Sequence, residues 1–401
     1  MKKTVIIGAG AGGMLAAHFL GNNDIKVTIL ERMDEPLKKI YATGNGKCNF
    51  TNLHLDKSCY TNMDDKTFNV ITRFDNMAVM NYFLESGVPP YENNGYIYPH
   101  SRQAASIAGA LINNVVSTGN VDIKTSCNVK AVDYADDKGF VVTYEENVAA
   151  KGEKNRFERK KEHCDYVIIA AGGKSSSVLG SDGSGTYLAR RLGHKIVCEM
   201  PALCPLITFE DVKELKGVRV ICKLNDEKGE IIFSEEGISG IPAFQVSSKI
   251  AGRLHDNEDV YIDVDFACDL HESVLKKALE HNFKHNPDNI YKGIVPDKLG
   301  KYIMKHNDCI DTYKAIDCLK MKFQVKAVAG FDKSQVTKGG VSLENVDLTT
   351  MESKIVKDMY FCGEVLDVDG KCGGYNLQWA FSSGYCAAMS IVEGAADDTD
   401  K

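Results

Sequence analysis

The chain has 401 residues, of which 44% are hydrophobic, 26% are charged and 13 are cysteine. That length allows two or three domains, with ample apolar sequence for their cores. The formal net charge of -7 argues against nucleic-acid binding as the main function. The odd number of cysteines, without Cys-x-x-Cys spacing or paired Cys/His clusters, predicts reduced thiols that are mostly buried, and no metal site.

The first 31 residues carry the strongest pattern in the chain. An apolar run at 4–7 is followed by the glycine-rich turn 8–13, an apolar helical stretch and a second strand at 26–30 that ends in Glu31. This order, with the acid at close to the usual spacing, is typical of the dinucleotide-binding fingerprint. The turn would present the N–H groups and partial positive charge of a helix N-terminus to a diphosphate.

Each residue of this fingerprint has a chemical reason. Gly8 allows the tight turn, Gly10 lets a diphosphate approach the backbone, and Gly13 lets the helix pack closely on the strand. Glu31 can accept hydrogen bonds from ribose hydroxyls. A glycine-rich turn in an ordinary βαβ unit is the alternative interpretation.

The N-terminus also imitates a signal peptide, because Lys2 and Lys3 precede an apolar run. The glycines of the turn and the strand that follows favour the fingerprint instead. No other stretch has the roughly 20 apolar residues that a membrane span needs. We therefore expect a soluble, cytoplasmic protein without a membrane partner.

The elements expected up to residue 194 alternate between loops, helices and strands. A loop at 32–41 leads into 42–52, where glycine, small and amide residues can bring backbone N–H groups near a ligand. We expect a helix at 66–86, a hairpin or loop at 91–100, a helix capped by Ser101, strands near 122–124, 129–134 and 139–144, a solvated hairpin tip at 151–162, a buried strand at 166–170, a loop at 180–185 and a helix at 186–192.

The composition shifts after residue 194. Residues 195–265 alternate in short strand-like pieces, and residues 271–325 are helix-like and rich in Lys, His and Asn. Strand character returns at 359–362, followed by an acidic, glycine-rich loop and a helix at 377–391. Residues 395–401 are expected to be a frayed polar tail. The pattern indicates an insertion, partly β and partly α, between two halves of a nucleotide-binding domain.

Glycine-rich loops follow three apolar strands, which is more than a nicotinamide-binding domain needs and suits an extended FAD molecule. At this point the sequence resembles a family of bacterial FAD-dependent oxidoreductases that includes aminoacetone oxidase and the bile-acid-pathway flavin reductase. The resemblance runs nearly end to end, and its most specific motifs are 43–52 and 373–380. Segments 237–240 and 337–341 add support, while Lys47 and Cys372 stand where arginine and threonine are common.

The resemblance implies an α/β fold with a discontinuous Rossmann-type FAD-binding domain, an inserted β-barrel-like subdomain and a helical subdomain. The corresponding division is 1–194 and 326–401 for FAD binding, 195–270 for the β-rich part and 271–325 for the helical part. The cofactor contacts that follow from the fingerprint and the resemblance are Gly8, Ala9, Gly10, Ala11, Gly12, Gly13, Glu31, Arg32, Gly44, Asn45, Gly46, Cys48, Asn49, Val129, Ala171, Gly172, Gly173, Gly363, Glu364, Asp367, Gly373, Gly374, Tyr375, Asn376 and Leu377.

The evidence for catalytic acid–base residues is weaker than the evidence for the cofactor contacts. Tyr98 and His100 could exchange protons over a flavin, although a surface aromatic and an ordinary loop histidine explain them equally well. Asn376 is better placed, because the loop before the last helix would meet the pyrimidine end of the flavin. Cys48 and Cys372 lie too far apart in sequence to favour a redox disulfide, so packed thiols are the preferred interpretation.

The leading functional hypothesis is an NAD(P)H-linked reductase of a C=C or related bond in a small organic substrate. A second glycine fingerprint is missing from the sequence, so NAD(P)H would dock transiently or oxygen would accept the electrons. The runner-up is an oxygen-using oxidase of a small amine such as aminoacetone, and the third hypothesis is an RNA-modifying flavoprotein. The sequence does not indicate the oligomeric state.

Overall fold

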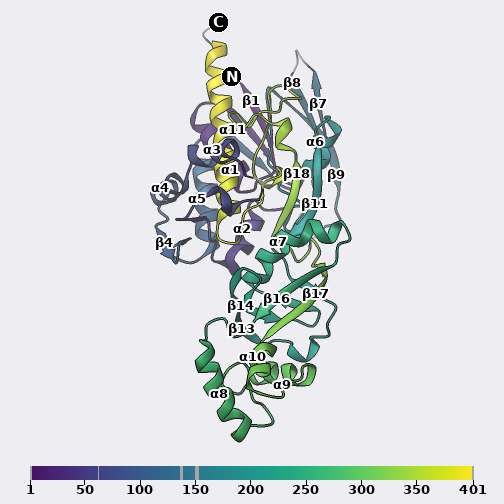
Figure 1. Ribbon diagram of the computed structural model, residues 1–401. Helices are drawn as coiled ribbons and strands as arrows, with labels where there is room; N and C mark the ends of the chain where they lie inside the picture. The colour runs from purple at the N-terminus through teal and green to yellow at the C-terminus, as the bar shows by residue number, and fades with distance from the viewer. Residues whose placement is uncertain (1, 62, 136–138, 150–152, 400–401) are drawn as a thin grey trace. The chain divides into compact units, whose positions relative to one another are not determined.

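A computed structural model describes residues 2–61, 63–135, 139–149 and 153–399 of the chain (Figure 1). The chain forms two compact units. Unit 1 comprises Met1–Glu199 and Val336–Lys401, and unit 2 comprises Met200–Gln335. Among the described residues, no helix is both long and apolar enough to cross a membrane.

Unit 1 is built on a parallel five-stranded sheet in the order β19-β10-β1-β2-β6. Strand β1 lies in the middle, and its Val5 and Ile6 have no solvent exposure. Short apolar runs of this kind are expected where helices or loops cover both faces of a parallel sheet. The strands are β1 (Lys3–Ile7), β2 (Lys26–Leu30), β6 (Val121–Lys124), β10 (Tyr166–Ile169) and β19 (Met359–Phe361).

The first and last helices of unit 1 pack against each other unusually closely. Gly12 of α1 and Gly384 of α11 make this possible, because a Cβ atom on Gly384 would lie 2.5 Å from the Gly12 carbonyl oxygen. Figure 1 shows α11 running beside α1. The helices of unit 1 are α1 (Ala11–Asn22), α2 (Lys38–Ala42), α3 (Asp65–Arg73), α4 (Asn76–Glu85), α5 (Ala104–Ser117), α6 (Ser184–Arg191) and α11 (Tyr375–Thr399).

Three smaller sheets complete unit 1 and the crossings to unit 2. Two are antiparallel, in the orders β3-β5-β4 and β7-β8-β9, and the third pairs β11 with β18. Their strands are β3 (Thr51–Asn52), β4 (Pro90–Asn93), β5 (Tyr96–Pro99), β7 (Cys127–Ala135), β8 (Gly139–Asn147), β9 (Phe157–Cys164), β11 (Ile196–Ala202) and β18 (Val336–Val341).

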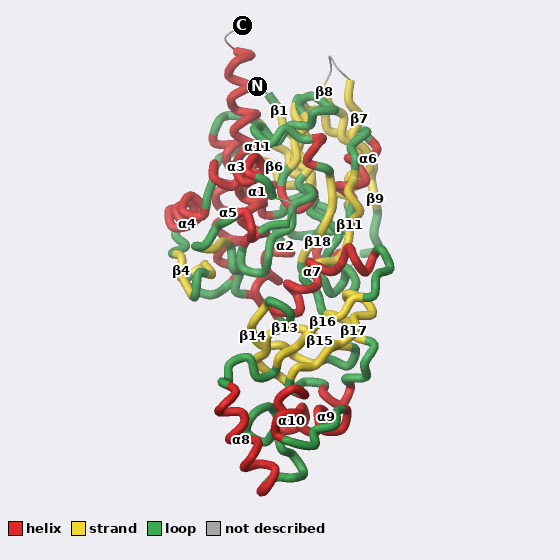
Figure 2. Tube along the Cα trace, viewed as in Figure 1, coloured by secondary structure: helices red, strands yellow, loops and turns green. Residues whose placement is uncertain are grey.

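Unit 2 contains a closed barrel of six strands in the order β12-β15-β14-β13-β16-β17. Strand β13 alternates buried and exposed residues, as expected for a strand with one face inside a barrel. Figure 2 shows the barrel strands in yellow with helices α8, α9 and α10 grouped at one end. The strands are β12 (Leu206–Thr208), β13 (Arg219–Leu224), β14 (Glu227–Phe233), β15 (Gly237–Ser239), β16 (Val260–Asp265) and β17 (Lys320–Val328). The helices are α7 (Ile241–His255), α8 (Glu272–His285), α9 (Asp297–His306) and α10 (Thr312–Cys318).

Several sequence expectations were wrong in detail. The helix expected at 66–86 is two helices, because the side chain of Asp75 accepts from the Ala78 N–H and starts α4. The helix expected after Ser101 begins at Ala104 with Gln103 as N-cap. Part of the expected loop 32–41 is α2, and part of the expected charged tip 151–162 is strand β9.

The remaining corrections concern two segment ends. The tail expected from residue 395 is helical through Thr399, and its last two residues, 400–401, lie outside the described residues. The helical segment expected to reach residue 325 ends earlier, because Lys320 already belongs to barrel strand β17. That strand alternates apolar and polar side chains, and its register against β16 makes it part of the barrel.

Candidate functional site

The carboxyl ends of the parallel strands carry most of the residues that the sequence predicts to bind a nucleotide. Because β1, β2, β10 and β19 are parallel, the segments that follow them meet at one edge of the sheet. These segments are 8–13, 31–33, 170–173 and 362–364. Strand β1 connects onward to β2 on one side and has β10 on its other side, which is the arrangement that opens a crevice for ligands.

Two glycines of the turn after β1 are required by the protein's own packing. Gly8 has a φ of 106°, and a Cβ atom on it would lie 2.6 Å from the carbonyl oxygen of Ala170. A Cβ atom on Gly13 would lie 2.2 Å from the Gly8 carbonyl oxygen. Both distances are far shorter than van der Waals contact. Only glycine therefore lets the turn lie this close to the residue after β10 and lets its own two ends approach each other.

Gly10 differs from these two glycines. A Cβ atom there would meet only the Ala170 carbonyl oxygen, at 3.9 Å, and the backbone of Gly10 is extended. Packing within the protein therefore does not require glycine at this position. Helix α1 starts at the next residue, without a side-chain cap and without an acidic residue in its first turn. The open space and the helix N-terminus together suit an anionic group.

Glu31 and Arg32 follow β2 directly at this edge of the sheet. The Glu31 carboxylate accepts hydrogen bonds from the backbone N–H groups of Ala9 and Met33, each at 2.8 Å. Arg32 forms an ion pair with Asp182 and donates from Nη2 to the Ser177 carbonyl oxygen at 3.3 Å. Its Nε atom is buried and has no hydrogen-bond partner in the part of the chain that the structure describes.

Val129 lies on β7, which begins beside Glu31. The Cys127 N–H donates to the Glu31 carbonyl oxygen at 2.8 Å, and the Ser126 N–H donates to the Met33 carbonyl oxygen at 2.7 Å. These bonds attach the start of β7 to the segment after β2. Val129 lies two residues after Cys127, the residue whose N–H bonds to Glu31.

The segment 43–49 has an irregular backbone. Gly44, Asn45, Gly46 and Cys48 have φ angles of 55°, 54°, 80° and 55°. Glycine and asparagine tolerate this left-handed region better than other residues, which explains their concentration here. Burial raises the pKa of the Cys48 thiol to about 12, so this cysteine keeps its proton at neutral pH.

Asn49 is held so that one side-chain atom remains available. Its Nδ2 donates to the carbonyl oxygens of Thr51 and Ile97, each at 2.9 Å. Its Oδ1 atom is buried and has no hydrogen-bond partner among the described residues. Buried acceptors are seldom left unsatisfied in native proteins, so a ligand donor at Oδ1 would fit the site.

The loop after β10 is tied to β18 and to the turn after β19. A Cβ atom on Gly173 would lie 2.5 Å from Oγ1 of Thr337, which accepts from the Lys174 N–H at 2.7 Å. The Thr337 N–H donates to Oε1 of Glu364 at 2.7 Å, and Lys39 lies 2.7 Å from the other oxygen. The carboxylate of Glu364 is therefore already engaged by two partners.

Helix α11 holds Gly363 through two hydrogen bonds. Its N–H donates to Ser383 Oγ at 2.9 Å, and its carbonyl oxygen accepts from Trp379 Nε1 at 3.1 Å. Trp379 is only 1% exposed, as expected for a core residue. The start of α11 thus positions the turn after β19 through side-chain hydrogen bonds that the sequence pattern does not reveal.

The glycine-rich loop before α11 packs against the small sheet β3-β5-β4. A Cβ atom on Gly374 would lie 2.5 Å from the Thr51 carbonyl oxygen, and one on Gly373 would lie 3.0 Å from Tyr96 and from Tyr375. Asn376 accepts from the Gly370 N–H at 2.8 Å and donates to the Gly370 carbonyl oxygen at 2.8 Å. Asn376 therefore shapes this loop.

The two hairpin candidates differ in their surroundings. Tyr98 is half-buried, and burial raises the pKa of its hydroxyl. A Cβ atom on Gly44 would lie 3.9 Å from the Tyr98 ring, so Tyr98 faces the segment 43–49. His100 is exposed, and its ring packs edge-on against Tyr91 at 6.2 Å. The structure brings Tyr98 to the predicted cofactor loops, whereas it leaves His100 on the surface.

Sequence reasoning missed a buried carboxyl beside this site. Asp369 is 2% exposed, and its Oδ2 accepts from Thr61 Oγ1 at 3.0 Å. Burial raises its pKa to about 6, although Lys338 and the Thr61 hydrogen bond act in the opposite direction. Burial also raises the pKa of Asp367. Only the presence of Asp369 in an acidic loop could have drawn attention to it.

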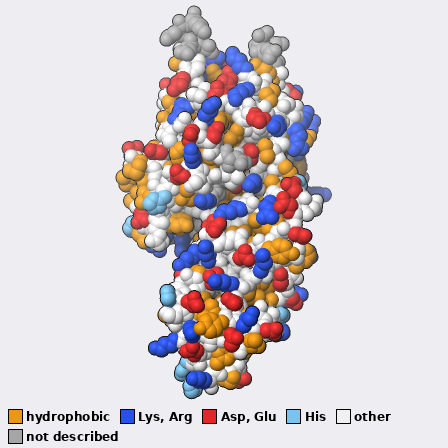
Figure 3. Space-filling model, viewed as in Figure 1, with side chains coloured by type: hydrophobic (Ala, Val, Ile, Leu, Met, Phe, Trp, Pro, Cys, Tyr) orange, Lys and Arg blue, Asp and Glu red, His pale blue; other side chains and the backbone are white. Residues whose placement is uncertain are grey.

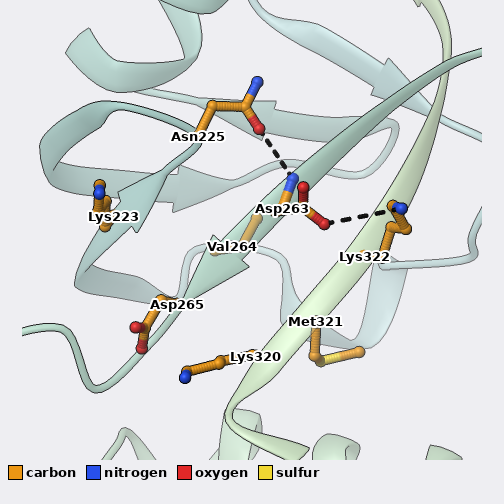
Figure 4. A pocket seen from close by; sticks show the side chains of 8 residues that line it. All are labelled: Lys223, Asn225, Asp263, Val264, Asp265, Lys320, Met321 and Lys322. Atoms are coloured by element: carbon orange, nitrogen blue, oxygen red, sulfur yellow. Dashed lines mark hydrogen bonds and ion pairs between the residues drawn. The ribbon is translucent and has the colours of Figure 1, made fainter.

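A separate hollow lies on the barrel of unit 2 and has a volume of about 250 Å³. Figure 4 shows Asn225 accepting from the Asp263 N–H at 2.9 Å, and Lys322 lies 4.0 Å from the Asp263 carboxylate. The lining residues are Lys223, Asn225, Asp263, Val264, Asp265, Lys320, Met321 and Lys322. Lysines and aspartates offset one another there, and we assign the hollow no ligand.

The fold and the strand-end loops of unit 1 define the class, a protein with a Rossmann-type nucleotide-binding domain. Residues 2–390 match the family described as HI0933-like protein Rossmann domain. The chain belongs to this family. The resemblance expected from the sequence and the expected fold class are both confirmed.

Relatives with curated names extend over nearly the whole chain. The chain is 35% identical to a 3-dehydro-bile acid delta(4,6)-reductase of Clostridium scindens, over 98% of this chain and 100% of that protein. It is 28% identical to a ribosomal RNA dihydrouridine synthase of Escherichia coli, over 97% of both. The full-length match to a reductase agrees with the expectation of an enzyme of the oxidoreductase class.

Solved structures confirm the fold. A 3-ketosteroid-delta4-(5alpha)-dehydrogenase from Rhodococcus jostii superimposes with a TM-score of 0.54 at 12% identity, covering 98% of this chain and 97% of that one. A flavocytochrome c3 fumarate reductase superimposes with a TM-score of 0.51 at 13% identity, covering 98% of this chain and 78% of that one. At such low identities the likeness concerns the fold alone.

Proposed function

We propose that this chain binds FAD in unit 1 and is an NAD(P)H-linked reductase of a C=C or related bond in a small organic substrate. The observation that carries the proposal is the full-length, 35% identity to a reductase in a chain whose predicted nucleotide-binding loops meet at one edge of a parallel sheet. Bound FAD would supply the hydride transfer itself. The chain's own residues would bind and orient the FAD and the substrate and polarise the bond that is reduced.

Three features of the structure support a bound dinucleotide. The space at Gly10 is open although the turn around it is closely packed. The buried Nε of Arg32 and the buried Oδ1 of Asn49 lack hydrogen-bond partners among the described residues. One atom is a donor and the other an acceptor, and the hydroxyl, phosphate and ring groups of FAD can satisfy both.

We assign the binding roles by position along the sheet edge. The turn 8–13 and the N-terminus of α1 would hold the diphosphate, and Glu31 would exchange its bonds with Ala9 and Met33 for ribose hydroxyls. The start of α11 would face the pyrimidine end, where its partial positive charge stabilises negative charge on the reduced ring. The remaining proposed contacts are Arg32, Gly44, Asn45, Gly46, Cys48, Asn49, Val129, Ala171, Gly172, Gly173, Gly363, Glu364, Asp367, Gly373, Gly374, Tyr375, Asn376 and Leu377.

We also propose that segments 1–194 and 326–401 form one FAD-binding domain, with the β-rich segment 195–270 and the mostly helical segment 271–325 inserted between them. A closed barrel inside unit 2, with helices α8 to α10 between its strands β16 and β17, supports the mixed β and α character of the inserted part. The acid or base that exchanges protons is left to experiment; of the two hairpin candidates, Tyr98 is the one that faces the predicted cofactor segment 43–49.

A second candidate function is RNA modification, because two relatives at 28% and 27% identity are named ribosomal RNA dihydrouridine synthase. The charges of this chain favour a small substrate. The net charge is -7, and on the face drawn in Figure 3 basic side chains are interspersed with acidic ones. An RNA-binding surface usually gathers Lys and Arg on one face.

An anaerobic absorbance titration of the purified protein tests the proposal. After incubation with FAD, we expect flavin bands that bleach when NADH or NADPH is added and recover on addition of a conjugated enone such as a 3-oxo-Δ4 steroid. Absence of flavin bands would overturn cofactor binding. Bands that bleach only with a small amine would move the assignment to an oxidase, and recovery with ribosomal RNA alone would move it to RNA modification.

A further inference from the structure

Two cysteine thiols of unit 2 meet at one buried phenol. Tyr291 has no solvent exposure, and its hydroxyl donates to the Ala315 carbonyl oxygen at 2.8 Å. The same hydroxyl oxygen lies 3.1 Å from Sγ of Cys309. The Cys318 thiol is close enough to both Cys309 and Tyr291 for their side chains to influence its pKa. The two thiols are therefore neighbours around the Tyr291 hydroxyl.

The two cysteines lie at opposite ends of α10. Cys309 stands in the loop before this helix, and Cys318 is the last helical residue. Both side chains are partly exposed, so a small solute can reach them. Cys222, on β13 of the same unit, has no solvent exposure although Cys268 is near enough to influence its pKa. Cys309 and Cys318 combine a neighbouring thiol with access from solvent.

We propose that Cys309 and Cys318 are an oxidisable dithiol, which hydrogen peroxide converts into an intramolecular disulfide across α10. In the first step one sulfur attacks the peroxide O–O bond, takes up one oxygen as a sulfenic acid and releases water. In the second step the other thiol attacks that sulfur, an S–S bond forms and a second water leaves. The sulfur atoms lose two electrons in total, and both peroxide oxygens are reduced to water.

The surroundings assign different roles to the two sulfurs. Burial, the contact with Cys309 and the charge of Asp317 raise the pKa of Cys318 to about 11, so Cys318 keeps its proton at neutral pH. The thiolate is the nucleophile in thiol oxidation. We therefore assign the first attack to Cys309 and the second to Cys318. The disulfide would replace the contact between Cys309 and the Tyr291 hydroxyl, whose bond to Ala315 remains.

The test uses the full-length protein, reduced and then treated with hydrogen peroxide. Remaining thiols are alkylated with N-ethylmaleimide before intact-mass analysis and peptide mapping. We expect a peptide pair joined between Cys309 and Cys318, a mass lower by two hydrogen atoms for this link, and reversal by dithiothreitol. Cys309→Ser and Cys318→Ser should each abolish the link, whereas Cys268→Ser should retain it.

A dimedone trap tests the order of the two steps. In Cys318→Ser protein, peroxide followed by dimedone should label Cys309, because the second thiol is missing. The proposal is overturned if both cysteines of the folded wild-type protein are alkylated after peroxide treatment. It is also overturned if the same link forms only after unfolding in urea, since the proximity of the two thiols in the folded protein would then play no part. These readouts need no bound cofactor and do not depend on the proposed function.

Discussion

The ammonium group of Lys39 lies 2.7 Å from Oε2 of Glu364, a residue 325 positions later in the chain. The other oxygen of Glu364 accepts from the Thr337 N–H at 2.7 Å. One carboxylate thus joins α2, which precedes unit 2 in sequence, to β18 and to the turn after β19, which follow it. Both partners are partly shielded from water, with side-chain exposures of 28% for Lys39 and 18% for Glu364.

We expect Glu364→Gln to lower the free energy of unfolding by about 1 kcal/mol, because the amide keeps an acceptor for Thr337 but loses the charge that Lys39 faces. Urea unfolding at neutral pH measures the change. The control is Glu344→Gln, whose partner Lys195 lies 2.9 Å away on the exposed surface, and a smaller loss than in Glu364→Gln is expected there because water screens the pair. Equal losses in the two variants would contradict the shielding argument.

Gly10→Ala should separate cofactor binding from folding. The new methyl group would meet only the Ala170 carbonyl oxygen, at 3.9 Å, so the melting temperature of the apoprotein should not change. The methyl would occupy space that a diphosphate needs, and we expect the FAD dissociation constant to rise by about tenfold or more. Fluorescence titration with FAD measures it.

The matched control is Gly109→Ala in α5, where a Cβ atom would meet nothing within 4 Å. It should bind FAD with wild-type affinity. Unaltered affinity in Gly10→Ala protein would mean that the space beside the turn is not where the diphosphate lies.

Asn376→Asp tests whether this residue shapes the loop or handles protons. The carboxylate could still accept from the Gly370 N–H, but it would face the Gly370 carbonyl oxygen without a proton to donate. We expect weaker FAD binding and an unchanged pH dependence of the reductive half-reaction, measured by stopped-flow bleaching. A shifted pH profile at saturating FAD would instead make Asn376 a proton-handling residue.

Asp369 makes stability depend on pH in a direction opposite to that of a salt-bridged carboxylate. Its folded-state pKa is raised to about 6, so the folded protein binds more protons than the unfolded chain between about pH 4 and 6. The wild type should therefore lose stability as the pH rises through this window, by roughly 2–3 kcal/mol for this group.

Asp369→Asn should remove that loss, because an amide can accept from Thr61 Oγ1 at every pH. The comparison is urea unfolding of the apoprotein at pH 4.5 and pH 7.5. We expect the variant to gain stability relative to the wild type as the pH rises. A difference between the two proteins that stays constant with pH would show that the carboxyl titrates normally.

The sequence predicted best where local chemistry decides the structure. The apolar runs that became β1, β2 and β10 were expected to be strands, and the turn between Ile7 and Ala11 was expected at its observed place. Glycine at Gly8 and Gly13 has no substitute, since a Cβ atom at either position would lie within 3 Å of backbone atoms. Steric demands of this kind leave a readable pattern.

Polar contacts between distant segments left no such pattern. The role of Thr337 as an acceptor for the loop after β10, and the pairing of Lys39 with Glu364, depend on how three segments meet in space. The five-residue helix α2 was missed because it is short and its N-cap, Leu37, has a left-handed backbone in place of a capping side chain. The closure of the barrel through β17 depends on a register between strands far apart in sequence.

The chain leaves unit 1 and returns to it at neighbouring points. The Ser342 N–H donates to the Lys195 carbonyl oxygen at 2.9 Å, and Gly339 packs against the carbonyl oxygen of Cys198. The two crossings therefore form a single β-ladder, in which β11 pairs with β18. Because the ends of the inserted part lie on neighbouring strands, its length and content can differ without changing the strand order of the parallel sheet in unit 1.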